Sequence, residues 1–131
     1  MKIKIYYHDT DCGGVVYYAN YLKYLEEART EFFETNGFLI RELAQKGTLF
    51  VVARQEIDYK SPAVYGDVLI IDTRVANISG VKMEFEYEIK NQDARLISKA
   101  KTILVCVDKT LKPRPIPEDI KKKIVNADPR N

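Results

Sequence analysis

The sequence has few of the residue types that build disulfide frameworks and metal centres. Its 131 residues include two cysteines and one histidine. Cys12 and Cys106 lie far apart and show no CxxC or zinc-type spacing, so we expect two reduced thiols. His8, Asp9 and Asp11 do not suggest a metal site, because neighbouring extended residues point to opposite faces and no second histidine completes a ligand set. We therefore expect neither a metal nor another cofactor.

Long hydrophobic runs and an excess of charge of one sign are also missing. The longest apolar stretches, such as residues 68–71, are far shorter than the ~20 residues that a membrane helix needs. The 21 basic residues nearly balance the 19 acidic ones and are scattered, apart from the lysines at 121–123. This pattern argues against membrane insertion and against a nucleic-acid-binding face. We expect a cytosolic protein.

The size and the apolar content predict one folded domain over residues 1–131. Hydrophobic residues make up 46% of the chain, and a chain of this length buries roughly two thirds of its unfolded surface. Alternation of polar and apolar residues predicts strands at 2–8, 49–59, 68–77, 81–90 and 95–107. Helical spacing predicts a long helix from Asn20, as its cap, to residues 36–37, a short helix within 38–46, and another beginning near Glu118.

These elements predict an α+β fold in which a five-stranded antiparallel sheet buries one face against the long helix. The turns at 77–80 and 91–94 have hairpin lengths, so the last three strands should form a meander. One helix cannot cover five strands, and exposed strand edges invite pairing with a second copy. We expect a homodimer that further assembles as a dimer of dimers, a homotetramer.

Residues 8–20 place a carboxylate, a glycine turn and a helix start within a few residues of one another. The Gly13-Gly14 turn permits positive φ, and the first turn of a helix offers unpaired N–H groups to a developing oxyanion. Asp11 could act on a carbonyl beside those donors, or it could simply cap the turn. For Asp9 we favour bonds to loop amides. For Cys12 we favour a small loop residue over a nucleophile, because the single histidine lies only four residues upstream.

Two motifs resemble the hotdog-fold acyl-CoA thioesterases, in the branch of the 4-hydroxybenzoyl-CoA and Tol-Pal-associated enzymes. The first is Asp-Thr-Asp-x-Gly-Gly-Val-Val-Tyr at 9–17, followed by Ala-Asn-Tyr at 19–21 and Glu-x-Ala-Arg at 26–29. The second is Asp-Tyr-Lys-Ser-Pro-Ala-x-Tyr-Gly-Asp at 58–67. The order of elements agrees over nearly the whole chain. The resemblance implies a hotdog domain whose dimers pair sheets edge to edge, with each active site at the subunit interface.

By position, the resemblance implies that Asp11 is the catalytic carboxylate and that the main-chain N–H of Tyr18 polarises the thioester carbonyl. Tyr18 stands where many Tol-Pal-associated members have histidine, which leaves the backbone donor but excludes an imidazole. Tyr59, Ser61 and Tyr65 are candidates for substrate binding from the partner's side of the pocket, or else form a kinked strand end. Only Lys82 matches the arginines that contact the cofactor phosphates in the aryl-CoA enzymes.

The sequence therefore predicts an enzyme that hydrolyses an acyl-CoA thioester, with Asp11 as either nucleophile or general base. A hydratase or dehydratase of acyl thioesters is less well supported, because those sites usually pair an acid with a histidine, and His8 is poorly placed relative to Asp11. A non-catalytic protein that binds acyl thioesters as a scaffold is the other alternative. The acyl group itself is not predicted.

Overall fold

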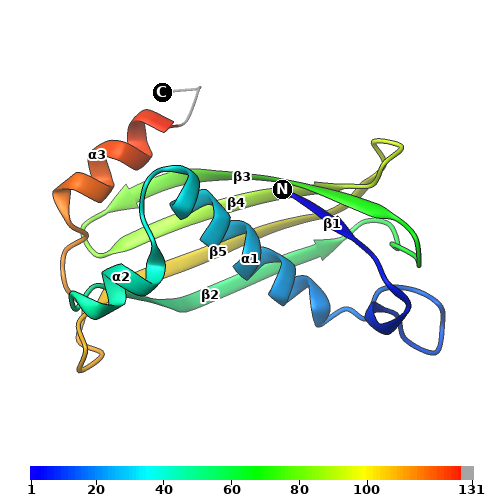
Figure 1. Cartoon of the computed structure of the whole chain (residues 1–131), viewed down its shortest axis with the longest axis horizontal. Helices are drawn as coiled ribbons and strands as arrows, with labels where there is room; N and C mark the ends of the chain where they lie inside the picture. Colours follow the sequence, from blue (N-terminus) through cyan, green and yellow to red (C-terminus); the bar gives the residue numbers. More distant parts are fainter. Residues whose placement is uncertain (128–131) are drawn as a thin grey trace.

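The computed structural model describes residues 1–127 and consists of one antiparallel sheet with helices on one side (Figure 1). The last four residues of the predicted domain, 128–131, lie outside the described residues. The order of strands in the sheet is β1-β3-β4-β5-β2. The strands are β1 (Lys2–Lys4), β2 (Leu49–Tyr59), β3 (Val68–Ser79), β4 (Lys82–Lys90) and β5 (Leu96–Val107). This confirms the predicted α+β fold with a five-stranded sheet.

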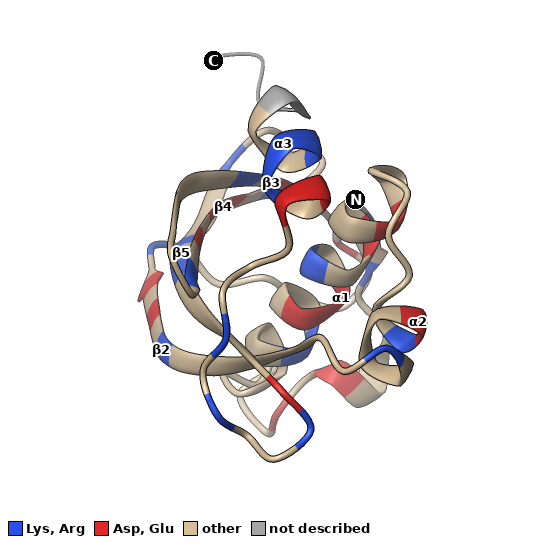
Figure 2. Cartoon of the chain, turned by 90° about the vertical axis from the view of Figure 1, so that its left-hand side faces the viewer, with Lys and Arg blue, Asp and Glu red and all other residues tan. Residues whose placement is uncertain are grey.

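The long helix α1 (Asn20–Thr35) lies across the sheet, and the sheet curves around it (Figure 2). Register shifts in β2, in β3 and in β5 opposite the end of β4 accompany this curvature, as β-bulges bend a strand. The shorter helices are α2 (Ile40–Gln45) and α3 (Glu118–Ala127). Positive φ at Gly37 and Gly47 allows the chain to leave the ends of α1 and α2.

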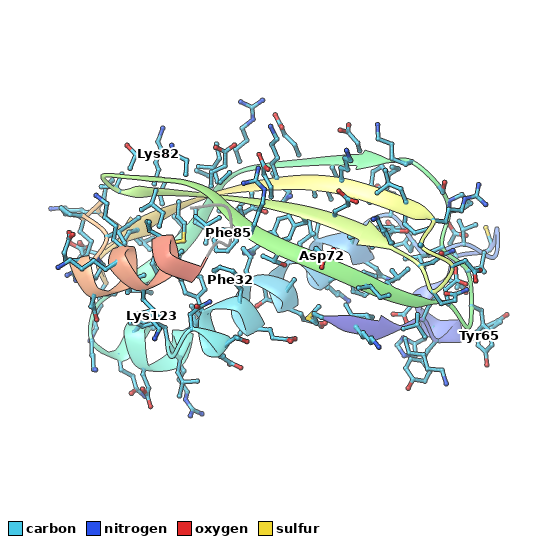
Figure 3. All side chains as sticks on the ribbon, turned by 90° about the horizontal axis from the view of Figure 1, so that it is seen from above. Phe32, Tyr65, Asp72, Lys82, Phe85 and Lys123 are labelled. Atoms are coloured by element: carbon cyan, nitrogen blue, oxygen red, sulfur yellow. The ribbon has the colours of Figure 1, made fainter. Side chains whose placement is uncertain are left out.

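The core forms between the inner face of the sheet, which is the face turned toward α1, and the apolar side of that helix. In β4, alternation places Met83, Phe85, Tyr87 and Ile89 inward and nearly fully buried. The rings of Phe32 and Phe33 pack against Phe85 with centroids 5.7 and 5.8 Å away. Figure 3 shows Phe32 and Phe85 facing each other between helix and sheet.

The first strand is shorter than the predicted 2–8. It ends at Lys4, and Tyr7–Asp9 form a 3₁₀ turn, η1. The cause is Asp9, whose Oδ2 accepts the N–H of Tyr6 at 2.8 Å and so favours a turn over the sheet ladder. The prediction that Asn20 caps α1 is also wrong, because Ala19 is the N-cap and Asn20 is the first helical residue.

Substitution of Phe85 tests the core. Phe85→Ala should lower the free energy of unfolding by about 3–5 kcal/mol, because it removes a fully buried ring that two phenylalanines of α1 contact. Urea unfolding followed by circular dichroism measures the change. Glu84→Ala, on the opposite face of the same strand, should stay within about 0.5 kcal/mol of the wild type. A similar loss in both variants would contradict this account of the core.

Candidate active site

The loop that carries Asp11 is a tight hairpin that leads into α1. Thr10 and Val16 form an isolated β-bridge, and the N–H of Asp11 donates to the carbonyl of Val15 at 2.9 Å. The N–H of Gly14 closes the turn on the carbonyl of Asp11 at 3.0 Å, with φ of 79° at Gly14. A residue with a side chain would be strained in this conformation, so glycine is needed at this position.

The Asp11 carboxylate is exposed and is held in place by its own turn. Its Oδ1 accepts the N–H of Gly13 at 2.8 Å. A Cβ at residue 13 would lie 3.2 Å from that oxygen, so glycine lets the carboxylate approach the amide closely. The turn-capping alternative is therefore present in the structure. It does not exclude chemistry, because within residues 1–127 Oδ2 has no hydrogen-bond partner, and a carboxylate has about four acceptor sites.

Asp9 makes the loop contacts that the sequence suggested for it. Besides the side-chain bond to Tyr6, its main-chain carbonyl accepts two donors, the N–H of Tyr17 at 2.9 Å and Nδ2 of Asn20 at 2.9 Å. His8 Nδ1 lies 3.6 Å from Asp9 Oδ1, with the imidazole largely exposed. The histidine thus lies beside Asp9, and within residues 1–127 it makes no hydrogen bond or ion pair with Asp11.

Unpaired main-chain donors occur where α1 begins. The first helical hydrogen bonds run from the N–H of Asn20 to the carbonyl of Tyr17 at 2.9 Å, and from Tyr21 to Tyr18 at 3.4 Å. Within residues 1–127, the N–H groups of Tyr18 and Ala19 make no hydrogen bond. They lie at the positive end of the helix dipole, where an oxyanion is stabilised.

Tyrosines surround this helix start. Tyr59, at the end of β2, donates from its hydroxyl to the carbonyl of Tyr18 at 3.2 Å, and its ring meets Tyr21 edge-on at 5.4 Å. A side-chain hydrogen bond with Tyr18 raises the pKa of Tyr17, and the negative charge of Asp11 adds to the effect. The hairpin bonds from Asp11 to Val15 and from Tyr17 to Asp9 bring the Asp11 turn back to the start of α1.

The other predicted substrate-binding residues divide between the two ends of the molecule. Ser61 Oγ accepts a hydrogen bond from Nε of Arg95 at 3.1 Å. The exposed ring of Tyr65 lies edge-on to the ring of Tyr7, with centroids 6.0 Å apart. Their segment joins the Asp11 loop through the bridge between Val15 and Val64. Figure 3 shows Lys82 at the opposite end from Tyr65. Lys82 pairs with Val105, and Val105 pairs with Val51 of β2. Lys82 is therefore level with Val51, which is eight residues, or ~26 Å, along β2 from Tyr59.

Sequence reasoning missed the connections made by Asn20 and Tyr24. The sequence predicted Asn20 as a helix cap because apolar helical spacing begins there. In the structure its side chain donates instead to the carbonyl of Asp9. The Tyr24 hydroxyl is buried and has no hydrogen-bond partner within residues 1–127. Burial, followed by the charge of Asp9, raises its pKa. The position of Tyr24 one turn beyond Asn20 was the available signal, but it is equally typical of a core residue.

A polar network on the inner face was also not predicted. Arg29 donates to the hydroxyls of Tyr87 at 3.2 Å and Thr102 at 3.3 Å, and Tyr87 donates to Thr102 at 3.0 Å. Thr102 in turn donates to Gln55 on β2 at 2.6 Å. The network connects the middle of α1 to the edge strand β2 across three strands of the sheet.

A hollow of about 650 Å³ lies on the outer face of the sheet, turned away from α1. Charged side chains of four strands line it, among them Asp58, Asp72, Glu88 and Lys99. None of the predicted site residues lines this hollow. Within residues 1–127, no three His, Cys, Asp or Glu side chains are placed to hold a metal ion, and no helix is long and apolar enough to cross a membrane.

Comparison with known proteins agrees with the fold and assigns the chain to a family. Residues 6–124 match the model of the Thioesterase-like superfamily. Acyl-CoA thioester hydrolase YbgC of Escherichia coli O6:H1 is 37% identical over 119 residues, which cover 90% of this chain and 89% of the relative. Acyl-CoA thioesterase YbgC of Haemophilus influenzae is 38% identical over 121 residues, covering 91% and 88%.

A solved structure leads to the same class. The 1,4-dihydroxy-2-naphthoyl-CoA thioesterase Slr0204 from Synechocystis superposes with a TM-score of 0.89 at 25% identity, covering 97% of this chain and 95% of that one. Fold and comparisons together define a hotdog thioesterase, a thioester hydrolase, which confirms the predicted class of enzyme. The chain belongs to the Thioesterase-like superfamily.

Ionisation of Tyr21 should make stability fall at alkaline pH. Burial, with the neighbouring Tyr59 second, raises the pKa of Tyr21 to about 12. The folded state thus favours the neutral phenol, and this contribution is complete below pH ~10 and is lost as the pH rises through about 12. Urea unfolding at pH 9 and 11.5 should show a smaller loss in Tyr21→Phe than in the wild type, by on the order of 1 kcal/mol.

The matched control is Tyr7→Phe, since Tyr7 is a largely exposed tyrosine. It should keep the alkaline loss of the wild type. An equal loss in the wild type and in Tyr21→Phe would show that the buried phenol does not contribute.

Proposed function

We propose that this protein is an acyl-CoA thioesterase that hydrolyses an acyl-CoA thioester to a free carboxylic acid and CoA at the junction of the Asp11 loop and α1. One observation carries the proposal. The Asp11 carboxylate is oriented by its own turn, and the unbonded amides of Tyr18 and Ala19 lie at the helix start. Six residues of the same loop separate Asp11 from Tyr18. The relatives named acyl-CoA thioester hydrolases support the choice of thioester.

In this proposal the carbonyl oxygen of the thioester accepts the N–H of Tyr18, which stabilises the negative charge that forms on attack. Asp11 acts in one of two ways. As a general base it takes a proton from water, the hydroxide adds to the carbonyl carbon, and the tetrahedral intermediate expels the CoA thiolate, which is then protonated. As a nucleophile it forms an acyl anhydride and releases the thiolate, and water then hydrolyses the anhydride.

Single-turnover hydrolysis in heavy-oxygen water separates the two routes. Label that appears in the Asp11 carboxylate favours the anhydride, because water then attacks an intermediate that includes this side chain. Label found only in the released acid favours the general base. Tyr59, Ser61 and Tyr65 line the approach to the junction in this proposal, with Tyr59 holding the carbonyl of Tyr18.

We further propose that the enzyme is a homodimer that pairs two β2 strands. Strand β2 is an edge of the sheet and is 11 residues long, and its Val51 and Val52 are exposed. Val52 is level with the inward-facing Leu104, so it sits on the helix side of the edge with half of its surface uncovered. A long edge strand with exposed valines favours pairing with another strand.

A strand that pairs with its own copy about a two-fold axis must run antiparallel to it. The Tyr59 end of each β2 would then lie beside the Val51 end of its partner. That is the level of Lys82 in the sheet. Lys82 is distant from Asp11 within one chain, and we propose that it serves the partner's site as a ligand for the CoA phosphates. The dimer of dimers stays a prediction from the sequence.

Removal of the charge on Asp11 tests the reaction. Asp11→Asn should lower kcat by about 10²-fold or more, because an amide is neither a base nor a nucleophile while its oxygen can still accept the N–H of Gly13. Thiol release from short, long and aryl acyl-CoAs measures the effect and identifies the acyl group. Asp93→Asn, on the exposed β4–β5 hairpin, is the control and should match the wild type.

Wild-type turnover by folded Asp11→Asn would overturn the proposal. Binding of acyl-CoA by the wild type without thiol release would favour a binding protein instead.

Charge placed on the edge of β2 tests the dimer. Val52→Asp should shift sedimentation from dimer toward monomer, because it would bury an unpaired carboxylate at the proposed interface. Thiol release should fall with it, since Lys82 would no longer reach the partner's site. Leu39→Asp, at the exposed N-cap of α2, should leave both properties unchanged. A wild type that sediments as a monomer while active would contradict the interface.

A further inference from the structure

The direction of the Tyr18 N–H is fixed by a closed set of three hydrogen bonds that has Asn20 at its centre. The main-chain N–H of Asn20 donates to the carbonyl of Tyr17 at 2.9 Å. The N–H of Tyr17 donates to the carbonyl of Asp9 at 2.9 Å. Nδ2 of Asn20 donates to that same carbonyl at 2.9 Å, which closes the ring. We name these three bonds the Asn20 clamp.

Because the peptide bond is planar, the bond from Asn20 to the carbonyl of Tyr17 also fixes the direction of the Tyr18 N–H. The carbonyl of Tyr17 and the N–H of Tyr18 belong to one trans peptide group, so they point in opposite directions. Since the carbonyl points along α1 to accept Asn20, the N–H of Tyr18 must point away from the helix, out of its first turn. Any rotation of this peptide would break the bond to Asn20.

The side chain of Asn20 fixes the other half of the site. Asp9 is two residues before Asp11 and is the last residue of η1, which leads into the hairpin, whereas Asn20 belongs to the helix. The bond from Nδ2 to the carbonyl of Asp9 therefore joins the segment that carries the acid to the segment that carries the amide donor. The carboxylate of Asp9 does not compete for this bond, because it accepts the N–H of Tyr6.

We propose that Asn20 is a positioning residue for the hydrolysis, which sets the separation and orientation of the Asp11 carboxylate and the Tyr18 N–H. This inference rests on the proposed function, since it assigns Asn20 a role in that same site. The chemistry predicts how its loss would be seen. Both groups act on the carbonyl carbon and oxygen as the tetrahedral intermediate forms, so their misplacement affects kcat, while most of the surface that binds CoA is untouched.

The chain offers a matched control at the other end of α1. Nδ2 of Asn36 donates to the carbonyl of Phe32 at 2.8 Å, which is the same type of side-chain to main-chain bond on the same helix. Asn36 is the C-cap of α1 and lies about 24 Å along the helix from Asn20. Loss of either side chain removes one such bond, and only one of the two bonds belongs to the site.

The experiment compares Asn20→Ala with Asn36→Ala in thiol release from the best acyl-CoA of the panel. We expect Asn20→Ala to lower kcat by about 10- to 100-fold with KM within about threefold of the wild type. Asn36→Ala should keep the wild-type kcat. Both variants should lose a similar few degrees in melting temperature, because each loses one comparable bond. Asn20→Asp keeps the shape but replaces the donor with an acceptor, and its kcat should fall at least as far.

Two results would overturn the inference. One is a wild-type kcat in folded Asn20→Ala or Asn20→Asp. The other is an equal fall in kcat for Asn36→Ala, which would mean that general loss of stability explains the effect. Asp11→Asn is assayed in parallel. If Asp11→Asn keeps full activity, the proposed site itself is wrong; if it is inactive while Asn20→Ala is not, only the role of Asn20 is wrong.

Discussion

The packing of α1 into the curved sheet is the constraint on which the rest of the molecule depends. Phe85 lies at the centre of that contact, with Phe32 and Phe33 against it. Burial of these rings fixes the helix along its length and thereby fixes where its first turn emerges. The Asp11 loop is placed by the helix that follows it, by the buried side chain of Val16 and by the bridge between Val15 and Val64.

Hydrogen bonds to main-chain groups order the polar part of the loop. Asp9, Asp11 and Asn20 each bond to main-chain groups of neighbouring residues, and glycine at 13 and 14 permits the close turn. Main-chain donors on both sides of the turn, at Asp11, Gly13, Gly14 and Tyr17, are satisfied within the segment. Within the described part of the chain, the amides of Tyr18 and Ala19 at the start of α1 stay unpaired and can donate to water or a ligand.

The edge strand β2 connects the fold to the proposed assembly. Its inner face is only partly covered by α1, and Gln55 on this strand is tied to Arg29 through Thr102. Side chains that a single copy leaves uncovered, such as Val52, would be covered by a partner. The same pairing would bring together Lys82 and Tyr59, which lie far apart in one chain. Assembly and reaction would thus depend on one edge.

The sequence by itself determined the elements and the class of enzyme. Alternation in β4 and the helical stripe of α1 are local patterns that one buried face imposes, and the two motifs carried the thioesterase assignment, which the comparisons confirmed. Tertiary structure alone decided the contact of the Tyr59 hydroxyl with Tyr18 and the bond from Asn20 to Asp9. Each of these contacts joins groups from separate segments of the chain. The pattern of polar and apolar residues along the sequence does not specify which separate segments come together.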